Sequence, residues 1–280
     1  MTTRRAGEPG PSVGRSGLVG AIAGALSGLF GVGGGIVIVP GLTGLTKMTQ
    51  RMAHGVSLAA IVPIAAAGAL GYLLDAKVSF AVAALLVSGS LVGAWIGTHL
   101  LSVLPQRTLR VGFAAILVAT GLRFLLAPGG VAERGDALLP DWSAVVIGLV
   151  AGVLSGLLGV GGGIVMVPAM MLLLGMSAVV AKGTSLLVIL PTALLGTYRN
   201  RHHGNTDLRV AAAVGIGGVI TAFGASRVSI GLDPTLSAVL FGALMSIVGG
   251  RMVALDVIAT RRDRADRLSE AAPPTGPAPD

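Results

Sequence analysis

Residues 24–40 read GALSGLFGVGGGIVIVP, and residues 152–168 read GVLSGLLGVGGGIVMVP. The two stretches are identical at 14 of 17 positions, at an offset of 128 residues. The same offset continues downstream and pairs Gly55 with Gly183, Ser57 with Ser185, and Pro63 with Pro191. The chain therefore consists of two repeats, each opening on a Gly-x-Gly-Gly-Gly cluster inside an apolar run.

The composition is that of a membrane protein. Hydrophobic residues make up 53% of the 280 residues, charged residues make up 11%, and the mean hydropathy is +0.87. A soluble domain carries about 25% charged residues. The net charge of +8 does not indicate nucleic-acid binding, because the basic residues lie in short loops and tails. The lack of cysteine excludes disulfides and thiol catalysis.

Eight apolar stretches are each long enough to cross a bilayer, which takes about 20 helical residues. They cover residues 17–45, 52–74, 78–103, 107–127, 142–174, 178–198, 207–231 and 235–258. The sequence thus predicts an all-α polytopic membrane protein with two four-segment repeats and about eight transmembrane helices. We expect a disordered tail at 1–16, a first membrane repeat at 17–127, a polar linker at 128–141, a second membrane repeat at 142–258 and a disordered tail at 259–280.

The glycine clusters lie inside the first and fifth segments and are expected to break both helices. Each glycine in a helix interior costs about 1 kcal/mol relative to alanine. Backbone groups freed by a break cannot face lipid, so other protein or a watery cavity must meet them. The second half-helix is expected to begin between Gly34 and Ile36, with its free N–H groups and positive dipole end suited to an anion. Interrupted segments at equivalent positions are the best sequence indication of a transporter's binding site.

Polar residues near the two breaks complete the predicted anion-binding site. Lys182 and its repeat equivalent His54 could add positive charge, although a snorkelling lysine and a histidine at a helix start are the simpler interpretations. Hydroxyl groups close to the breaks could bind the anion or merely cap helices. The predicted substrate-binding residues are Gly33, Gly34, Gly35, Gly161, Gly162, Gly163, Ser57, His54, Lys182, Thr184 and Ser185.

Motifs of other functions are missing or incomplete. The glycine cluster lacks the last glycine of G-x-G-x-x-G, and residues 181–184 have alanine where a phosphate-binding loop needs glycine. No H-E-x-x-H motif and no clustered carboxylates occur in the apolar segments. We therefore expect no enzyme activity, no cofactor and no metal site, and any transport should depend on gradients.

The distribution of lysine and arginine predicts that both termini are cytoplasmic. If every segment crosses once, 13 basic residues lie on the side of the termini and 6 on the other side. If the first and fifth segments are re-entrant hairpins, each repeat crosses three times and the two repeats are inverted, with almost the same charge bias. The sequence leaves both topologies open.

The pattern resembles the sulfite exporter TauE/SafE family of bacterial membrane proteins, over about residues 17–258. The resemblance is carried by GLFGVGGGIVIVP and GLLGVGGGIVMVP, by the segments HGVSL and KGTSL that follow them, and by the loop from Tyr198 to Gly204. The first repeat departs from this pattern, because its equivalent loop is reduced to the stretch from Tyr72 to Lys77. A second, symmetric basic site at that loop is therefore not expected.

The resemblance implies a multi-pass permease or exporter of the bacterial inner membrane that handles sulfite or organosulfonates. A small anion and the lipid bilayer are the expected partners, and no nucleic acid is expected. Association into a homo-oligomer stays open. Two other classes also stay open: a cation or metal carrier, which would need intramembrane carboxylates or histidine pairs, and a non-transporting membrane scaffold, which would not need paired helix breaks.

Overall fold

The computed structural model describes residues 13–46, 48–100, 106–127, 137–158, 161–202, 204 and 206–270. Regular structure in these residues is helical throughout, without a strand. The helices of the first repeat are α1 (Val13–Phe30), α2 (Gly35–Thr46), α3 (Gln50–Leu73), α4 (Phe80–Leu100) and α5 (Gln106–Leu126). Those of the second repeat are α7 (Ser143–Leu158), α8 (Gly163–Leu173), α9 (Ala178–His202), α10 (Leu208–Gly231) and α11 (Pro234–Glu270).

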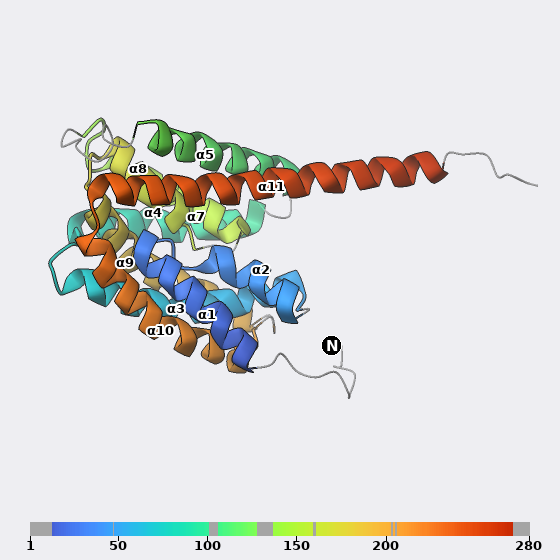
Figure 1. Ribbon diagram of the computed structural model, residues 1–280, viewed down its shortest axis with the longest axis horizontal. Coiled ribbons are helices and arrows are strands. Elements are labelled where there is room, and N and C mark those ends of the chain that lie inside the picture. Colours follow the sequence, from blue (N-terminus) through green and yellow to red (C-terminus); the bar gives the residue numbers. More distant parts are fainter. Residues whose placement is uncertain are drawn as a thin grey trace, which may run out of the picture.

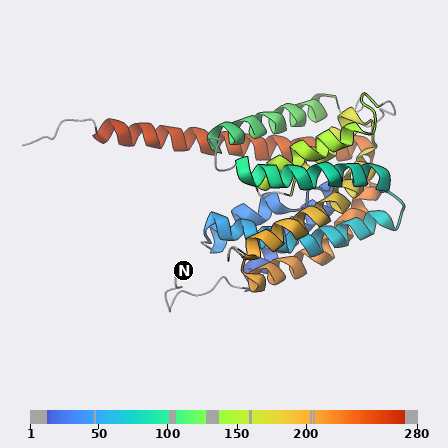
Figure 2. The ribbon, with the colours of Figure 1, turned by 180° about the vertical axis from the view of Figure 1, so that it is seen from behind.

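The helices pack side by side in one bundle (Figures 1 and 2). Within the described residues, α3, α4, α9, α10 and the Pro234–Ala254 part of α11 are long and apolar enough to cross a membrane. The other apolar helical stretches, in α2, α5, α7 and α8, are shorter. An all-helical protein with several candidate membrane spans is therefore confirmed, whereas a count of eight crossing helices stays a prediction.

The two repeats are interleaved in space. α1 of the first repeat packs most extensively against α10 of the second, and at the equivalent position α7 of the second repeat packs against α4 of the first. α3 and α9 cross antiparallel, since Tyr72 near the end of α3 lies against Gly183 near the start of α9, and Leu58 lies against Gly196. Each repeat thus depends on the other for its packing.

Glycine permits the closest of these helix contacts. A Cβ atom on Gly24 or Gly28 of α1 would overlap carbonyl oxygens of α10, and one on Gly89 or Gly93 of α4 would overlap carbonyl oxygens of α7. The four-residue spacing places each pair on one helix face, where small residues let backbones approach in lipid.

Each broken segment folds back on itself. In the first, Gly41 of α2 packs against Val19 of α1. In the second, the N–H groups of Leu138 and Leu139, just before α7, both donate to the carbonyl oxygen of Leu173 at the end of α8, at 2.9 Å. The outer ends of each helix pair therefore lie together, which is the geometry of the re-entrant alternative.

The bundle has two distinct ends. α1 begins and α11 ends at one of them, which we call the terminal end (Figure 1). The opposite end, which we call the far end, carries the turns after α3 and α10, residues 74–79 and 232–233.

α11 is longer than the segment that the sequence predicts. Its 37 residues span about 55 Å at 1.5 Å per residue, and its last turns project beyond the bundle at the terminal end (Figures 1 and 2). The helix continues past 258, the expected end of the last segment, because residues 259–270 are rich in arginine, alanine and other good helix formers. Most of the expected tails and linker, residues 1–12, 128–136 and 271–280, lies outside the described residues.

Candidate functional site

Both helix breaks occur at the glycine clusters, as the sequence predicted. Residues 31–34 separate α1 from α2, and residues 159–162 separate α7 from α8. Gly34 and Gly162, which precede the second helix of each pair, have left-handed φ angles of 77° and 74°. A side chain is strained in this conformation, so glycine suits the residue that starts each half-helix.

The two breaks meet inside the protein. Ile61 of α3 and Ile189 of α9 are repeat equivalents, and a Cβ atom on Gly161 would lie 3.8 Å from a side-chain atom of each. Gly163 lies close to the first break, where a Cβ atom would come within 2.6 Å of the carbonyl oxygen of Gly31. The described glycines of both breaks are buried. Protein therefore covers the interrupted backbone, whose polar groups could not face lipid.

Within the part of the chain that the structure describes, the first amide groups of α2 and α8 have no hydrogen-bond acceptor. The first amides with a helical partner are those of Val37, which donates to Gly34 at 3.0 Å, and Val165, which donates to Gly162 at 3.1 Å. The preceding amides, which belong to Gly35, Ile36, Gly163 and Ile164, donate no hydrogen bond to another described residue. Each unsatisfied buried group costs about 1–3 kcal/mol, and together these amides form the positive ends of two helix dipoles.

The carbonyl end of the first break is, by contrast, well satisfied. The Tyr72 hydroxyl donates to Gly28 O at 2.7 Å. Ser229 Oγ donates to Leu29 O at 2.9 Å, and Ser185 Oγ donates to Gly31 O at 2.9 Å. Two hydroxyl groups thus cap the last turn of α1, where helices otherwise leave carbonyl groups free, and a third caps Gly31 just after it. These bonds occupy three carbonyl groups at this break, whereas the amides of Gly35 and Ile36, which suit an anion, have no acceptor among the described residues.

Lys182 lies beside the first break, at the far end. Its backbone packs against Gly31, where a Cβ atom would lie 2.7 Å from the Lys182 Cα. Its Nζ donates to Ser229 Oγ at 3.0 Å and also to Ser237 Oγ. The Nζ is 5.9 Å from the ring centre of Phe30, the last residue of α1. The Lys182 side chain is buried and bonds to these two serines instead of extending to the surface.

The predicted hydroxyl residues have different surroundings. Ser185 lies between the breaks, because its Oγ bonds to Gly31 and would be 2.9 Å from a Cβ atom on Gly163. Thr184 Oγ1 instead accepts from the N–H of Ser79 at 3.0 Å, in the turn after α3. Ser57 is fully buried, and its Oγ has no partner among the described residues. Ser185 therefore lies beside both breaks and Thr184 holds the turn after α3, while an anion-binding role for Ser57 stays a prediction.

His54 does not join Lys182 in one cluster. It is half-buried in the second turn of α3, whereas Lys182 lies in the second turn of α9. Because α3 and α9 are antiparallel, the two repeat-equivalent residues lie toward opposite ends of the bundle. No group of three metal-ligating side chains occurs in the part of the chain that the structure describes.

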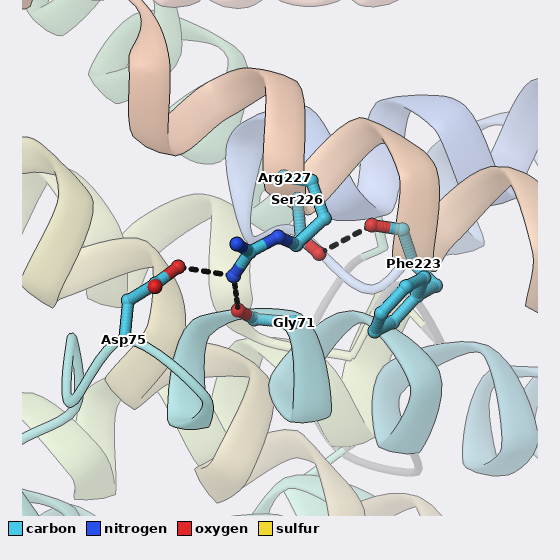
Figure 3. Close-up of polar contacts among 5 residues, drawn as sticks. All are labelled: Gly71, Asp75, Phe223, Ser226 and Arg227. Atoms are coloured by element: carbon cyan, nitrogen blue, oxygen red, sulfur yellow. Dashed lines mark hydrogen bonds and ion pairs between the residues drawn. The ribbon is translucent and has the colours of Figure 1, made fainter.

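Figure 3 shows an ion pair at the far end. Arg227 of α10 contacts Asp75 in the turn after α3, and its Nη1 also donates to Gly71 O at 3.2 Å. Both side chains are partly exposed, at 44% and 34%, so the pair contributes little free energy.

Four residues of the site were missed by sequence reasoning: Phe30, Tyr72, Ser229 and Ser237. Ser229 and Ser237 give no signal of their own, since isolated serines are common in apolar helices. Tyr72 could have been found, because it is one of two tyrosines in the chain and a buried tyrosine hydroxyl usually needs a partner.

Comparison with known proteins connects this arrangement to transporters. A family model described as sulfite exporter TauE/SafE matches residues 2–124 and 144–278. The probable membrane transporter protein YunE of Bacillus subtilis is 31% identical over 221 residues, covering 70% of this chain and 81% of the relative. YdhB of the same organism is 27% identical over 210 residues, covering 74% and 86%. A probable membrane transporter protein of Xylella fastidiosa is 28% identical over 206 residues, covering 71% and 78%.

Proposed function

The chain belongs to the sulfite exporter TauE/SafE family of membrane transporters, and we propose that it carries small anions, in the first place sulfite or organosulfonates. The anion binds where the two helix breaks meet, at the free amides that begin α2 and α8. Ser185 lies between these amides and Gly31, and Lys182 adds a positive charge beside the first break.

One observation supports this proposal above all: at the first break three carbonyl groups accept hydrogen bonds from side chains, whereas the first two amides of α2 donate none to the described residues. Hydroxyl groups cap the carbonyl oxygens of Gly28, Leu29 and Gly31, while the amides of Gly35 and Ile36 have no acceptor among the described residues. A sulfite or sulfonate group supplies several acceptor oxygens and a negative charge, and such groups bind well at helix N-termini. A cation would have to compete with these three hydroxyl groups for the carbonyl oxygens.

The transport mechanism we propose is alternating access between inverted repeats. In this arrangement the membrane is crossed by α3, α4, α5, α9, α10 and α11. Each broken segment is re-entrant, so it enters the membrane and leaves it again on the same side. Because α1 packs on α10 and α7 on α4, a rocking motion of one group of helices against the other would expose the central anion to one end and then to the other.

The proposed location is the bacterial inner membrane, with the terminal end in the cytoplasm. The positive-inside rule supports this orientation. Described basic residues toward the terminal end are Arg15, Arg51, Arg199, Arg201, Arg209 and Arg251, and those toward the far end are Lys77, Arg123, Lys182 and Arg227.

The two alternative functions have less support. A cation or metal carrier would need buried carboxylates, but every aspartate with a described side chain is exposed or half-buried. A non-transporting scaffold would not need free amides at two equivalent breaks. The names of the relatives, all probable membrane transporter proteins, also favour transport.

A flux assay with the purified protein tests this function. We expect proteoliposomes that contain the protein to take up radiolabelled sulfite or sulfoacetate faster than protein-free liposomes. An excess of the unlabelled anion should compete, and taurine, which also carries an ammonium group, should compete less well because Lys182 repels that group. Uptake of inorganic cations with no uptake of any of the three sulfur compounds would refute the proposal.

A further inference from the structure

We propose that Lys182 is a gating residue at the far end. Its ammonium group ties α9 to α10 and α11 through Ser229 and Ser237, and it releases both helices when an anion replaces the two hydroxyl groups. This inference rests on the proposed function, because the anion that opens the gate is the one that is transported.

The ammonium group is buried with no counter-ion among the described residues. Lys182 is 1% exposed and is the only charged side chain among the buried residues that the structure describes. The aspartates with a described side chain are exposed or half-buried, and the ion pair that joins Arg227 to Asp75 lies at the surface. Burying a charge costs several kcal/mol unless a partner of opposite charge compensates. Two neutral hydroxyls and the ring of Phe30 compensate only in part, so an anion has a large advantage over them.

The contacts of Lys182 connect the central site to the helices at the far end. Its backbone is held against Gly31 in the first break, whereas its Nζ reaches across to α10 and α11. α9 and α11 otherwise touch only slightly, so the bond to Ser237 is the main polar link between them in the described residues. Ser229 also donates to Leu29 O and would keep this bond after the ammonium group leaves. Release of Lys182 therefore frees α11 first.

The gate is confined to one end of the protein. The repeat equivalent of Lys182 is His54, and the positions equivalent to Ser229 and Ser237 hold Leu101 and Leu109. The first repeat thus has no matching set of an ammonium group and two serines at the equivalent positions. An anion would control opening at the far end directly, while opening at the terminal end would depend on other groups.

Single-cysteine labelling tests the gate, because the chain has no cysteine of its own. Ala238, next to Ser237 on α11, is 1% exposed, and Ala238→Cys provides one buried thiol. In nanodiscs, sulfoacetate is expected to raise the rate of labelling by a polar maleimide about fivefold, as the open state becomes populated. The response should disappear when Lys182→Met is added, since methionine fills the same space without a charge.

Two serine variants make the test specific. Ser237→Ala removes one partner of the ammonium group, so the sulfoacetate concentration for half-maximal labelling should fall about tenfold. Ser246→Ala is the matched control on α11, because its buried hydroxyl has no partner among the described residues, and it should leave that concentration unchanged.

The outcomes separate the gate from the transport function. Sulfoacetate transport without any labelling response, or a response that survives Lys182→Met, would overturn the gate and leave anion transport standing. A Lys182-dependent labelling response in a protein that moves no anion would keep the gate and overturn transport. Absence of both the response and the flux would overturn both.

Discussion

Replacement of Gly162 by leucine is expected to abolish anion transport while the protein still reaches the membrane. Gly162 has a φ of 74°, and a Cβ atom there would lie 3.1 Å from Ala151 O and 3.3 Å from a side-chain atom of Met166. Leucine would shift the start of α8 and misplace the amides that we assign to the anion. Strain of about 1–3 kcal/mol at this site should lower sulfite flux more than tenfold.

The equivalent variant and a control define this prediction. Gly34→Leu should have the same effect, because a Cβ atom on Gly34 would lie 2.7 Å from Ala23 O, the repeat equivalent of Ala151. Gly224→Leu on α10 should be neutral, since nothing lies within 4 Å of a Cβ atom at that glycine. Flux in proteoliposomes, normalised to the amount of inserted protein, is the measurement. Unchanged flux in both break variants would remove the glycine breaks from the mechanism.

Reversal of the charge at Lys182 is the second change with a large expected effect. In Lys182→Glu, a carboxylate would face the carbonyl end of α1 and the ring face of Phe30, both of which are electronegative. It would also repel the incoming anion. We expect sulfite and sulfoacetate flux to fall about 100-fold or more, because the interaction free energy of the anion with a buried positive charge and with a buried negative charge differs by several kcal/mol. The amount of folded protein should fall as well.

Size-exclusion chromatography in detergent separates loss of folding from loss of transport in this variant. Arg209→Glu is the matched charge reversal, because Arg209 is exposed at the start of α10, and it should retain most of the flux. If the fraction of Lys182→Glu that is folded and inserted transported the anions at the normal rate, the permeation path could not pass Lys182.

The helix breaks could be predicted from the sequence because their causes are local. Glycine disfavours a helix interior, and positive φ angles such as that of Gly34 are open to glycine at little cost. The second half-helix begins at Gly35, within the expected range of Gly34 to Ile36. The duplication made the same prediction for α8, whose first residue is Gly163.

The direction of the chain after each break could not be predicted in the same way. A straight helix pair and a hairpin have the same apolar composition, and the difference lies in contacts such as that of Gly41 with Val19. These contacts form only when the interleaved repeats are assembled. The charge bias of the loops was no help, because it is nearly equal for both topologies.

The surroundings of Lys182 also depend on tertiary structure. Its partners are 47 and 55 residues away along the chain, on two other helices. Repeat equivalence suggested that His54 would share its site, but inversion of the repeats places equivalent residues toward opposite ends. Sequence alone therefore identified Lys182 as a candidate without showing which groups it binds.

Crystallography with selenite would show whether an anion binds to the amides of α2 and α8 where the two breaks meet. Selenite has the shape and charge of sulfite, its selenium gives an anomalous signal, and the chain has no thiol that it could oxidise. We expect an anomalous peak beside the amides of Gly35 and Gly163, with selenite oxygens about 3 Å from their nitrogen atoms. Peaks confined to surface arginines, with none at either break, would contradict it.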